Sequence, residues 1–247
     1  MIRTYRSADW NDYRMSYYAP HEKLESLDRE IAVVDEALSA LYGAGVLSHV
    51  AYDHERLLAL RRTVRQNFDI PWTSITPRTQ RLLYAINAIL KPATMVAAGV
   101  FCGNTFISNA GAAVGPGACY EARNLIGVEI KPEEAARGER NIRTIDPTGL
   151  ARVVAADAVA WVAKFQGPIH LLYLDAKEES PKGKGIYLDI LEACYDSLPQ
   201  GGVVLAHDSV SAEERLAHYL AFARDEAHFR ISVNVVLDME GLEVSVK

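Results

Sequence analysis

The sequence predicts an α/β protein: a doubly wound, mostly parallel sheet of seven strands that ends in an antiparallel hairpin and carries an N-terminal helical cap. From residue 73 onward, short apolar runs alternate with longer helical segments, which is typical of parallel strands joined by right-handed crossovers. The last two apolar runs are joined only by the short turn at residues 238–241, which predicts a hairpin. Residues 1–72 carry helical periodicity instead, so we expect them to form the cap.

The cap is expected to contain two helices. Between residues 24 and 41, leucine, isoleucine and valine recur at steps of three and four, which places them on one face of a helix. A second helix is expected over residues 54–66. The apolar face of the first helix has two interpretations: it packs on its own domain, or it joins two copies of the chain in a homodimer.

The first twenty residues are rich in aromatic side chains. They hold Tyr5, Trp10, Tyr13, Tyr17 and Tyr18. One interpretation is ordinary packing of the cap, and the other is a lid that closes over a ligand pocket. The sequence leaves both interpretations open.

The sheet domain is expected over residues 73–247 and begins with a helix at residues 79–90. Its parallel strands are expected at residues 95–98, 125–130, 152–155, 169–174 and 202–206. The helices between and after them are expected at residues 133–143, 158–165, 185–197 and 212–227. The terminal hairpin is expected at residues 229–237 and 242–246.

Composition and charge argue against several classes of protein. The 247 residues include 26 Lys+Arg and 32 Asp+Glu, a formal net charge of −6, whereas a nucleic-acid binder needs a concentrated basic face. No apolar run approaches the roughly 18 uninterrupted residues of a membrane span, and the first residues do not resemble a secretory signal. Three cysteines without CxxC spacing suggest neither a disulfide framework nor a zinc site. We therefore expect a cytoplasmic protein with no nucleic-acid or membrane partner.

Two glycines follow the first parallel strand in the run VAAGVFCGNTF. Gly99 and Gly103 stand just before a helix, where glycine lets the backbone approach a ligand and the helix N-terminus offers unpaired N–H donors. The run matches neither the dinucleotide fingerprint nor the P-loop. Close packing of the strand against the helix is the alternative explanation.

Polar residues follow the other strands at the edge where their carboxyl ends meet. Glu129 ends the second strand, where a doubly wound fold places an acid for ribose hydroxyls; the alternative is a solvent-facing strand end. Asp157 follows the third strand, Asp175 the fourth, and His207 and Asp208 the fifth. His207 is either a base, since its reference pKa is near neutrality, or a strand-end histidine with a backbone partner. Together these positions predict a ligand site at this edge.

Residues 73–247 resemble the class I S-adenosylmethionine (SAM)-dependent methyltransferases, most closely the small-molecule O-methyltransferases. The segments that carry the resemblance are TSITPRTQRLL, AAGVFCGNT, GVEIKP, AADA, YLDAKEES and LPQGGVVLAHDS. The resemblance implies SAM as cofactor, with the glycine loop around its methionine part, Glu129 on the ribose and Asp175 facing the reaction centre. The implied cofactor-binding residues are Thr76, Gly99, Val100, Phe101, Gly103, Asn104, Thr105, Glu129, Ile130, Asp157, Ala158 and Asp175.

The sequence departs from this family at two places. Relatives usually carry an acid two residues before the first glycine of the loop, and this chain has Ala97. Metal-dependent relatives use an Asp and then Asp-Asn after the fifth strand, whereas this chain has Asp175 and then Asp208-Ser209. Oxygen-rich sites suit Mg²⁺ or Ca²⁺, but serine in place of asparagine favours a site without metal.

The expected function is methyl transfer from SAM to a hydroxyl of a small molecule. Asp175, His207 and Asp208 are placed to remove a proton, and Tyr17 of the aromatic segment is the fourth expected catalytic residue.

Two alternatives remain. The first is intramolecular cyclisation of SAM to azetidine-2-carboxylate and methylthioadenosine, as in the azetidine-2-carboxylate synthases that share this fold. Ala97 would leave the attacking amine neutral, and tyrosines would cage the sulfonium. The second is a non-catalytic binding module.

Overall fold

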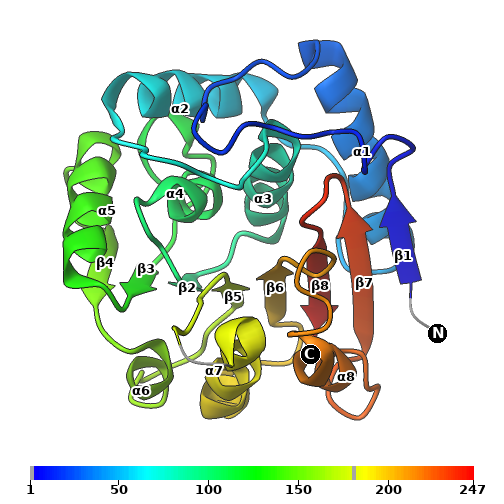
Figure 1. Cartoon of the computed structure of the whole chain (residues 1–247). Coiled ribbons are helices and arrows are strands. Elements are labelled where there is room, and N and C mark those ends of the chain that lie inside the picture. Colours follow the sequence, from blue (N-terminus) through cyan, green and yellow to red (C-terminus); the bar gives the residue numbers. More distant parts are fainter. Residues whose placement is uncertain (1–2, 180–181) are drawn as a thin grey trace.

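The structure is a computed structural model, and it describes residues 3–179 and 182–247. Residues 1–2 of the expected cap and Ser180 of the segment YLDAKEES lie outside the described residues. The described chain forms one sheet of eight strands in the order β1-β7-β8-β6-β5-β2-β3-β4 (Figure 1). The strands are β1 (Arg3–Arg6), β2 (Thr94–Ala98), β3 (Asn124–Glu129), β4 (Ala151–Ala155), β5 (Leu171–Leu174), β6 (Val203–His207), β7 (Ile231–Val236) and β8 (Leu242–Val246).

The sheet is doubly wound around a switch between β2 and β5. From β2 the chain moves outward to β3 and β4, then returns to the other side of β2 to form β5 and β6, all in parallel. The strands β7 and β8 are antiparallel to each other, and β8 lies antiparallel to β6. The predicted parallel sheet with a terminal hairpin is therefore confirmed. Ligands of such sheets bind outside the carboxyl ends of the strands at the switch.

The sheet has one strand more than the sequence predicted. β1 pairs in parallel with β7, with Arg3 opposite Val233 and Arg6 opposite Val236, and so covers what would be the edge of the hairpin. Its sequence, RTYR, is short and polar, and three of its four residues are exposed. Because no alternation of apolar and polar residues marks it, the pattern that identified the other strands could not find it.

Helices cover both faces of the sheet (Figure 1). One face carries α1 (Leu27–Gly43), α2 (His54–Asn67), α3 (Pro77–Leu90), α4 (Asn104–Ala110) and α5 (Pro132–Ile145), and the other carries α6 (Ala158–Val162), α7 (Ile186–Cys194) and α8 (Ala217–Ala223). Short 3₁₀ turns stand at η1 (Gly115–Gly117), η2 (Gly183–Gly185) and η3 (Tyr195–Ser197). Within the described part of the chain, no helix is both long and apolar enough to cross a membrane.

Two helices are shorter than the sequence predicted. The segment predicted as a helix over 158–165 leaves the α-helical pattern after Val162, because the N–H groups of Lys164 and Phe165 bond to carbonyls three residues back. The segment predicted over 212–227 becomes helical only at Ala217, since residues 209–216 form turns beside the terminal hairpin.

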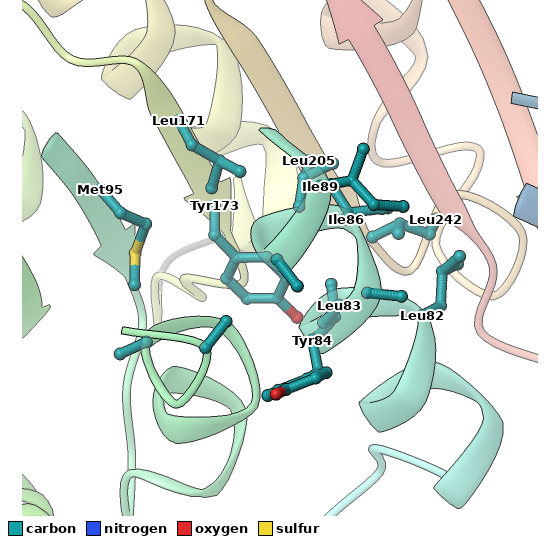
Figure 2. Close-up of a cluster of buried hydrophobic side chains, with 14 of the residues drawn as sticks. Leu82, Leu83, Tyr84, Ile86, Ile89, Met95, Leu171, Tyr173, Leu205 and Leu242 are labelled. Carbon is teal, nitrogen blue, oxygen red and sulfur yellow. The ribbon is translucent and has the colours of Figure 1, made fainter. Parts of the chain in front are cut away.

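Helix α3 lies at the centre of the first hydrophobic layer. Its side chains are buried along nearly its whole length. Figure 2 shows how they meet the sheet, with Leu82, Leu83, Ile86 and Ile89 of α3 beside Tyr173 of β5, Leu205 of β6 and Leu242 of β8. The helix therefore spans the strands whose ends carry the predicted site.

The apolar face of α1 packs within its own chain. Val34, Leu38 and Leu41 are fully buried, and α1 lies against α3. Internal packing therefore accounts for these three residues, whereas Leu27 at the start of the same face is 39% exposed. A homodimer stays a prediction.

A buried arginine ties the N-terminal segment to α3. The Arg78 guanidinium is fully buried, pairs with Asp9 at 2.8 Å and Glu25 at 2.6 Å, and lies 3.7 Å from the ring centre of Tyr13. The hydrogen bond from Arg78 holds the pKa of the Asp9 carboxyl well below the usual range. Arg78 thus joins the first 25 residues to the helix at the centre of the core.

We expect Arg78→Leu to lower the free energy of unfolding by about 2–3 kcal/mol, because two carboxylates lose their cation; the cost stays below that of a fully buried pair since Asp9 is partly exposed. Arg29→Ala is the matched control. Arg29 pairs with the same Asp9 at 3.4 Å on the surface, so its loss should cost less than about 1 kcal/mol. Urea unfolding followed by circular dichroism measures both, and equal losses would contradict the role of Arg78.

Candidate active site

The loop after β2 passes directly over the end of β5. Gly99 and Gly103 have φ of +84° and +88°, and Phe101 between them has φ of +50°. A Cβ on Gly99 would lie 2.5 Å from the carbonyl group of Asp175 and the backbone nitrogen of Ala176. Glycine is required at position 99 for both the backbone angle and the close approach.

The carboxylate of Glu129 anchors this loop. One oxygen accepts hydrogen bonds from the N–H groups of Val100 at 3.1 Å and Phe101 at 2.8 Å, and the other accepts from the N–H of Lys131 at 3.0 Å. Glu129 is buried, so it is not the solvent-facing strand end that was the alternative. A carboxylate that receives backbone donors from the loop sets the loop's shape before any ligand binds.

Exposed apolar side chains flank the anchored loop. Trp72 packs on Phe101 with their ring centres 4.7 Å apart and is 42% exposed, and Ile130, directly after Glu129, is 58% exposed. Apolar surface of this kind beside a polar loop suits a flat ligand. Trp72 was not among the predicted site residues, because a single tryptophan in a loop carries no periodic or motif signal.

Asn104 and Thr105 begin α4 and are both buried. The Asn104 amide donates to Thr73 Oγ1 at 3.1 Å, which ties α4 to the segment that precedes α3. The side chains of these two predicted cofactor-binding residues therefore face the interior at the start of the helix.

Two other predicted cofactor-binding side chains cap helices. Thr76 caps α3 and donates its hydroxyl to Asp238 at 2.6 Å. Asp157 caps α6 by accepting from the N–H of Ala160 at 2.7 Å, and Ala158 is the first residue of that helix. Asp157 is exposed at the sheet edge, whereas Thr76 is buried.

Ala97 lies inside β2 in register with Gly127 of β3 and Tyr173 of β5. It is buried, and the neighbouring Tyr173 hydroxyl is also buried and has no hydrogen-bond partner within the described ranges. Neither cross-strand neighbour of Ala97 is therefore an acid.

The predicted Asp175, His207 and Asp208 come together beyond the ends of β5 and β6. Each offers a ligand atom, and these atoms lie within 4.8 Å of one another. Asp208 has φ of +63°, an uncommon backbone angle for an aspartate. Strain of this kind is frequent at functional sites.

A lysine that the sequence analysis did not single out lies between the two carboxylates. Lys184 Nζ is 2.6 Å from Asp175 Oδ1, 2.5 Å from Asp208 Oδ2 and 3.1 Å from the hydroxyl of Tyr187. Burial alone would lower the pKa of Lys184, but the two carboxylates outweigh it and hold that pKa above its ordinary value. In the sequence, Lys184 stands between two glycines and cannot be told from an exposed surface lysine. Only the fold shows that it lies between the two carboxylates.

His207 is fully buried beside the same carboxylates. Its Nδ1 lies 2.8 Å from Asp208 Oδ1 and 3.6 Å from Asp175 Oδ1, but neither ring nitrogen is aligned for a hydrogen bond with any described residue. Burial disfavours the imidazolium, yet Asp208 and Asp175 outweigh it and hold the pKa of His207 well above its ordinary value. The pKa of Asp208 is held well below its usual range despite burial, chiefly by His207 and Lys184. The two carboxylates thus favour the protonated ring, which would have to lose a proton before it could act as a base.

Tyr17 lines a cavity. Its hydroxyl donates to Glu240 Oε1 at 2.5 Å, which raises its pKa. The cavity has a volume of about 340 Å³, and its walls include Tyr13, Met15, Tyr17, Tyr18, Met239 and Glu240. The Glu240 carbonyl accepts from the N–H of Val210 at 2.9 Å, so the hairpin turn connects this cavity to the segment that follows Asp208.

The donor set does not fit a divalent cation as it stands. Lys184 Nζ is within 2.6 Å of one oxygen of each carboxylate, so an ion bridging these oxygens would overlap with the ammonium. The hydroxyl of Ser209 donates to Asn234 Oδ1 at 2.9 Å and is turned away from the carboxylates.

Part of the chain is similar to a known family. Residues 96–209 match the family model of a methyltransferase domain. A search of curated proteins finds no significant match.

Solved methyltransferases share the fold. An O-methyltransferase from Bacillus cereus in complex with SAH is 14% identical, with 87% of this chain and 97% of that chain covered and a TM-score of 0.54. A SAH-bound methyltransferase from Podospora anserina is 13% identical, with 92% and 99% covered and a TM-score of 0.58. The O-methyltransferase TomG from Streptomyces achromogenes, in complex with SAM and involved in tomaymycin synthesis, is 16% identical, with 86% and 95% covered and a TM-score of 0.54.

The chain therefore has the class I methyltransferase fold, and residues 96–209 are similar to a methyltransferase domain. The predicted resemblance is confirmed at the level of that domain and fold.

We expect Gly99→Ala to lower the free energy of unfolding by more than about 3 kcal/mol, because left-handed strain adds to a clash with the backbone of β5. Gly167→Ala is the control: its φ is +107° but nothing lies within 4 Å, so strain alone should cost about 1–2 kcal/mol. Chemical denaturation compares them. A loss at Gly99 no larger than at Gly167 would show that the loop does not need this contact.

Proposed function

We propose that this chain is a SAM-dependent methyltransferase that acts on a hydroxyl of a small molecule. One observation carries the proposal: a glycine loop anchored by Glu129 and a charged cluster of Asp175, His207 and Asp208 stand at the same carboxyl edge of the sheet. The methyltransferase domain and the SAM- and SAH-bound structural neighbours support the chemistry.

The residues of the edge fit SAM. The loop from Gly99 to Gly103 would pass around the methionine part, and Glu129 lies at the strand end where ribose hydroxyls would bind. Ile130, Asp157 and Ala158 would border the adenine, with the Ile130 side chain offering an exposed apolar surface. The bound cofactor supplies an electrophilic methyl group on its sulfonium.

The charged cluster would hold the acceptor hydroxyl in line with that methyl group. The ammonium of Lys184 offsets part of the negative charge of Asp175 and Asp208, and these carboxylates favour the protonated form of His207. Such a cluster tolerates an acceptor oxygen in its anionic form better than two unpaired carboxylates would. We propose that Asp175 orients the hydroxyl and that His207, once deprotonated, takes its proton.

Residues 1–72 would serve as the cap of the acceptor site. Tyr17 and its neighbours line the cavity of about 340 Å³, which has room for one small planar molecule. We accordingly propose a small-molecule acceptor, no nucleic-acid or membrane partner, and a cytoplasmic location, in keeping with the net charge of −6 and the sparse cysteines.

Cyclisation of SAM to azetidine-2-carboxylate is the second candidate. Ala97 and the unpaired hydroxyl of Tyr173 favour it, because they leave the cofactor's amino group without a carboxylate in this part of the sheet. The third candidate function is that of a non-catalytic binding module.

Incubation with SAM alone, and then with a panel of phenols and alcohols, separates the candidates. We expect bound SAM to stay intact without acceptor and S-adenosylhomocysteine to form only with acceptor, as followed by mass spectrometry. Methylthioadenosine with an equal amount of a four-carbon amino acid, formed without acceptor, would establish cyclisation instead. An absence of SAM binding would contradict both enzymatic proposals.

A pair of variants tests the site itself. Glu129→Ala should weaken SAM binding at least about tenfold in calorimetry, because it removes the ribose acceptor and the anchor of the loop. Glu133→Ala, an exposed acid in the first turn of α5, should leave the affinity unchanged.

A further inference from the structure

We propose that Lys184 is a built-in cation that occupies the place of a divalent metal ion between Asp175 and Asp208, so that removing its ammonium group opens a divalent-cation site. The part that Lys184 plays in catalysis rests on the proposed function, whereas its occupation of a cation site does not.

The cluster has the arrangement of a divalent-cation site in which the Lys184 ammonium takes the position of the metal ion. Asp175, Asp208 and His207 present ligand atoms within 4.8 Å of one another, from the ends of two adjacent parallel strands. His207 is fully buried, and its ring nitrogens have no hydrogen-bond partner in the described ranges. Carboxylate oxygens and an imidazole nitrogen together suit Mn²⁺. The ammonium lies at the point where such an ion would bridge the oxygens.

The ammonium is held in place by its own contacts. Its three N–H groups face four acceptors: the carboxylates of Asp175 and Asp208, the Tyr187 hydroxyl and, at 3.4 Å, the Asp175 carbonyl. No donor is left over for a substrate, so Lys184 is a positioning residue. It neutralises the carboxylates and sets the direction in which Asp175 faces the acceptor.

A short 3₁₀ turn places Lys184 beside the two carboxylates. Lys184 is the middle residue of η2, between Gly183 and Gly185, and Gly183 has φ of +53°. The N–H of Glu178 donates to the Gly183 carbonyl at 3.1 Å, which joins η2 to the segment that follows Asp175. The side chain of Lys184 is only 13% exposed.

A divalent ion and the ammonium exclude each other. Both need the same oxygens, and the two cations would repel one another at that separation in a mostly buried site. Unaltered protein is therefore expected to leave added Mn²⁺ free. Lys184→Ala is expected to bind Mn²⁺ with two carboxylates and the neutral imidazole of His207, whose proton is released to solvent on binding.

The test is a Mn²⁺ titration followed by electron paramagnetic resonance, in which free Mn²⁺ gives the signal. We expect Lys184→Ala to bind Mn²⁺ at least about tenfold more tightly than the unaltered chain. Lys182→Ala is the matched control, because Lys182 pairs with Asp189 outside the cluster and its loss should change nothing. Adding Asp208→Asn to Lys184→Ala should abolish the new site.

Equal Mn²⁺ binding by the unaltered chain and Lys184→Ala, strong or weak, would overturn the proposal, as would an effect of Lys182→Ala of the same size. If Lys184→Ala is too unstable to titrate, the melting temperature is measured instead. Mn²⁺ should raise the melting temperature of Lys184→Ala and leave that of the unaltered chain unchanged. No rise for Lys184→Ala would overturn the proposal.

These readouts need neither SAM nor turnover. A chain that binds no SAM but shows the Lys184-dependent Mn²⁺ site would contradict the proposed function alone, and a SAM-binding chain without that site would contradict the role of Lys184 alone.

Discussion

The close approach of the β2 loop to the end of β5 is the constraint on which the site depends. Because Gly99 lies against the backbone of Asp175, the cofactor loop and the first residue of the charged cluster are fixed relative to each other by main chain alone. Glu129 then holds the loop from the opposite side through the N–H groups of Val100 and Phe101. The two halves of the proposed reaction centre are thereby positioned by strands that neighbour one another at the switch of the sheet.

Buried cations perform a common task in this molecule. Arg78 joins Asp9 and Glu25 of the N-terminal segment to α3, and Arg81 pairs with Glu30 of α1 at 2.5 Å. Lys184 does the same between two strand ends. In each case, residues distant in sequence are held together by a charge that would be costly to bury alone. Buried cations paired with carboxylates thus hold together both the cap and the proposed acceptor site.

The sequence was most informative where chemistry is tied to order along the chain. Glu129, Asp175, His207 and Asp208 could be grouped because each follows a recognisable apolar strand, and parallel strands bring their ends to one edge. It was least informative for residues placed by loops. The sequence around Lys184 contains no pattern that distinguishes a buried lysine from an exposed one.

The same limit explains the remaining differences. β1 is too short and polar to show alternation, and it is recognisable as a strand only because β7 is there to pair with it. The cofactor roles of Thr76 and Asp157 come from the resemblance, although Asp157 also stands out by its place after a strand. The structure shows that both side chains cap helices, a role that any Thr or Asp can take before a helix. The roles proposed for them at the cofactor remain predictions.

A crystal structure of the protein with S-adenosylhomocysteine tests the central claim most directly. The account predicts that the ribose hydroxyls lie on Glu129, that the sulfur lies above Gly99 and faces Asp175, and that Lys184 still bridges Asp175 and Asp208. A ligand bound away from the Glu129 loop, or one whose sulfur faces away from Asp175, would contradict it.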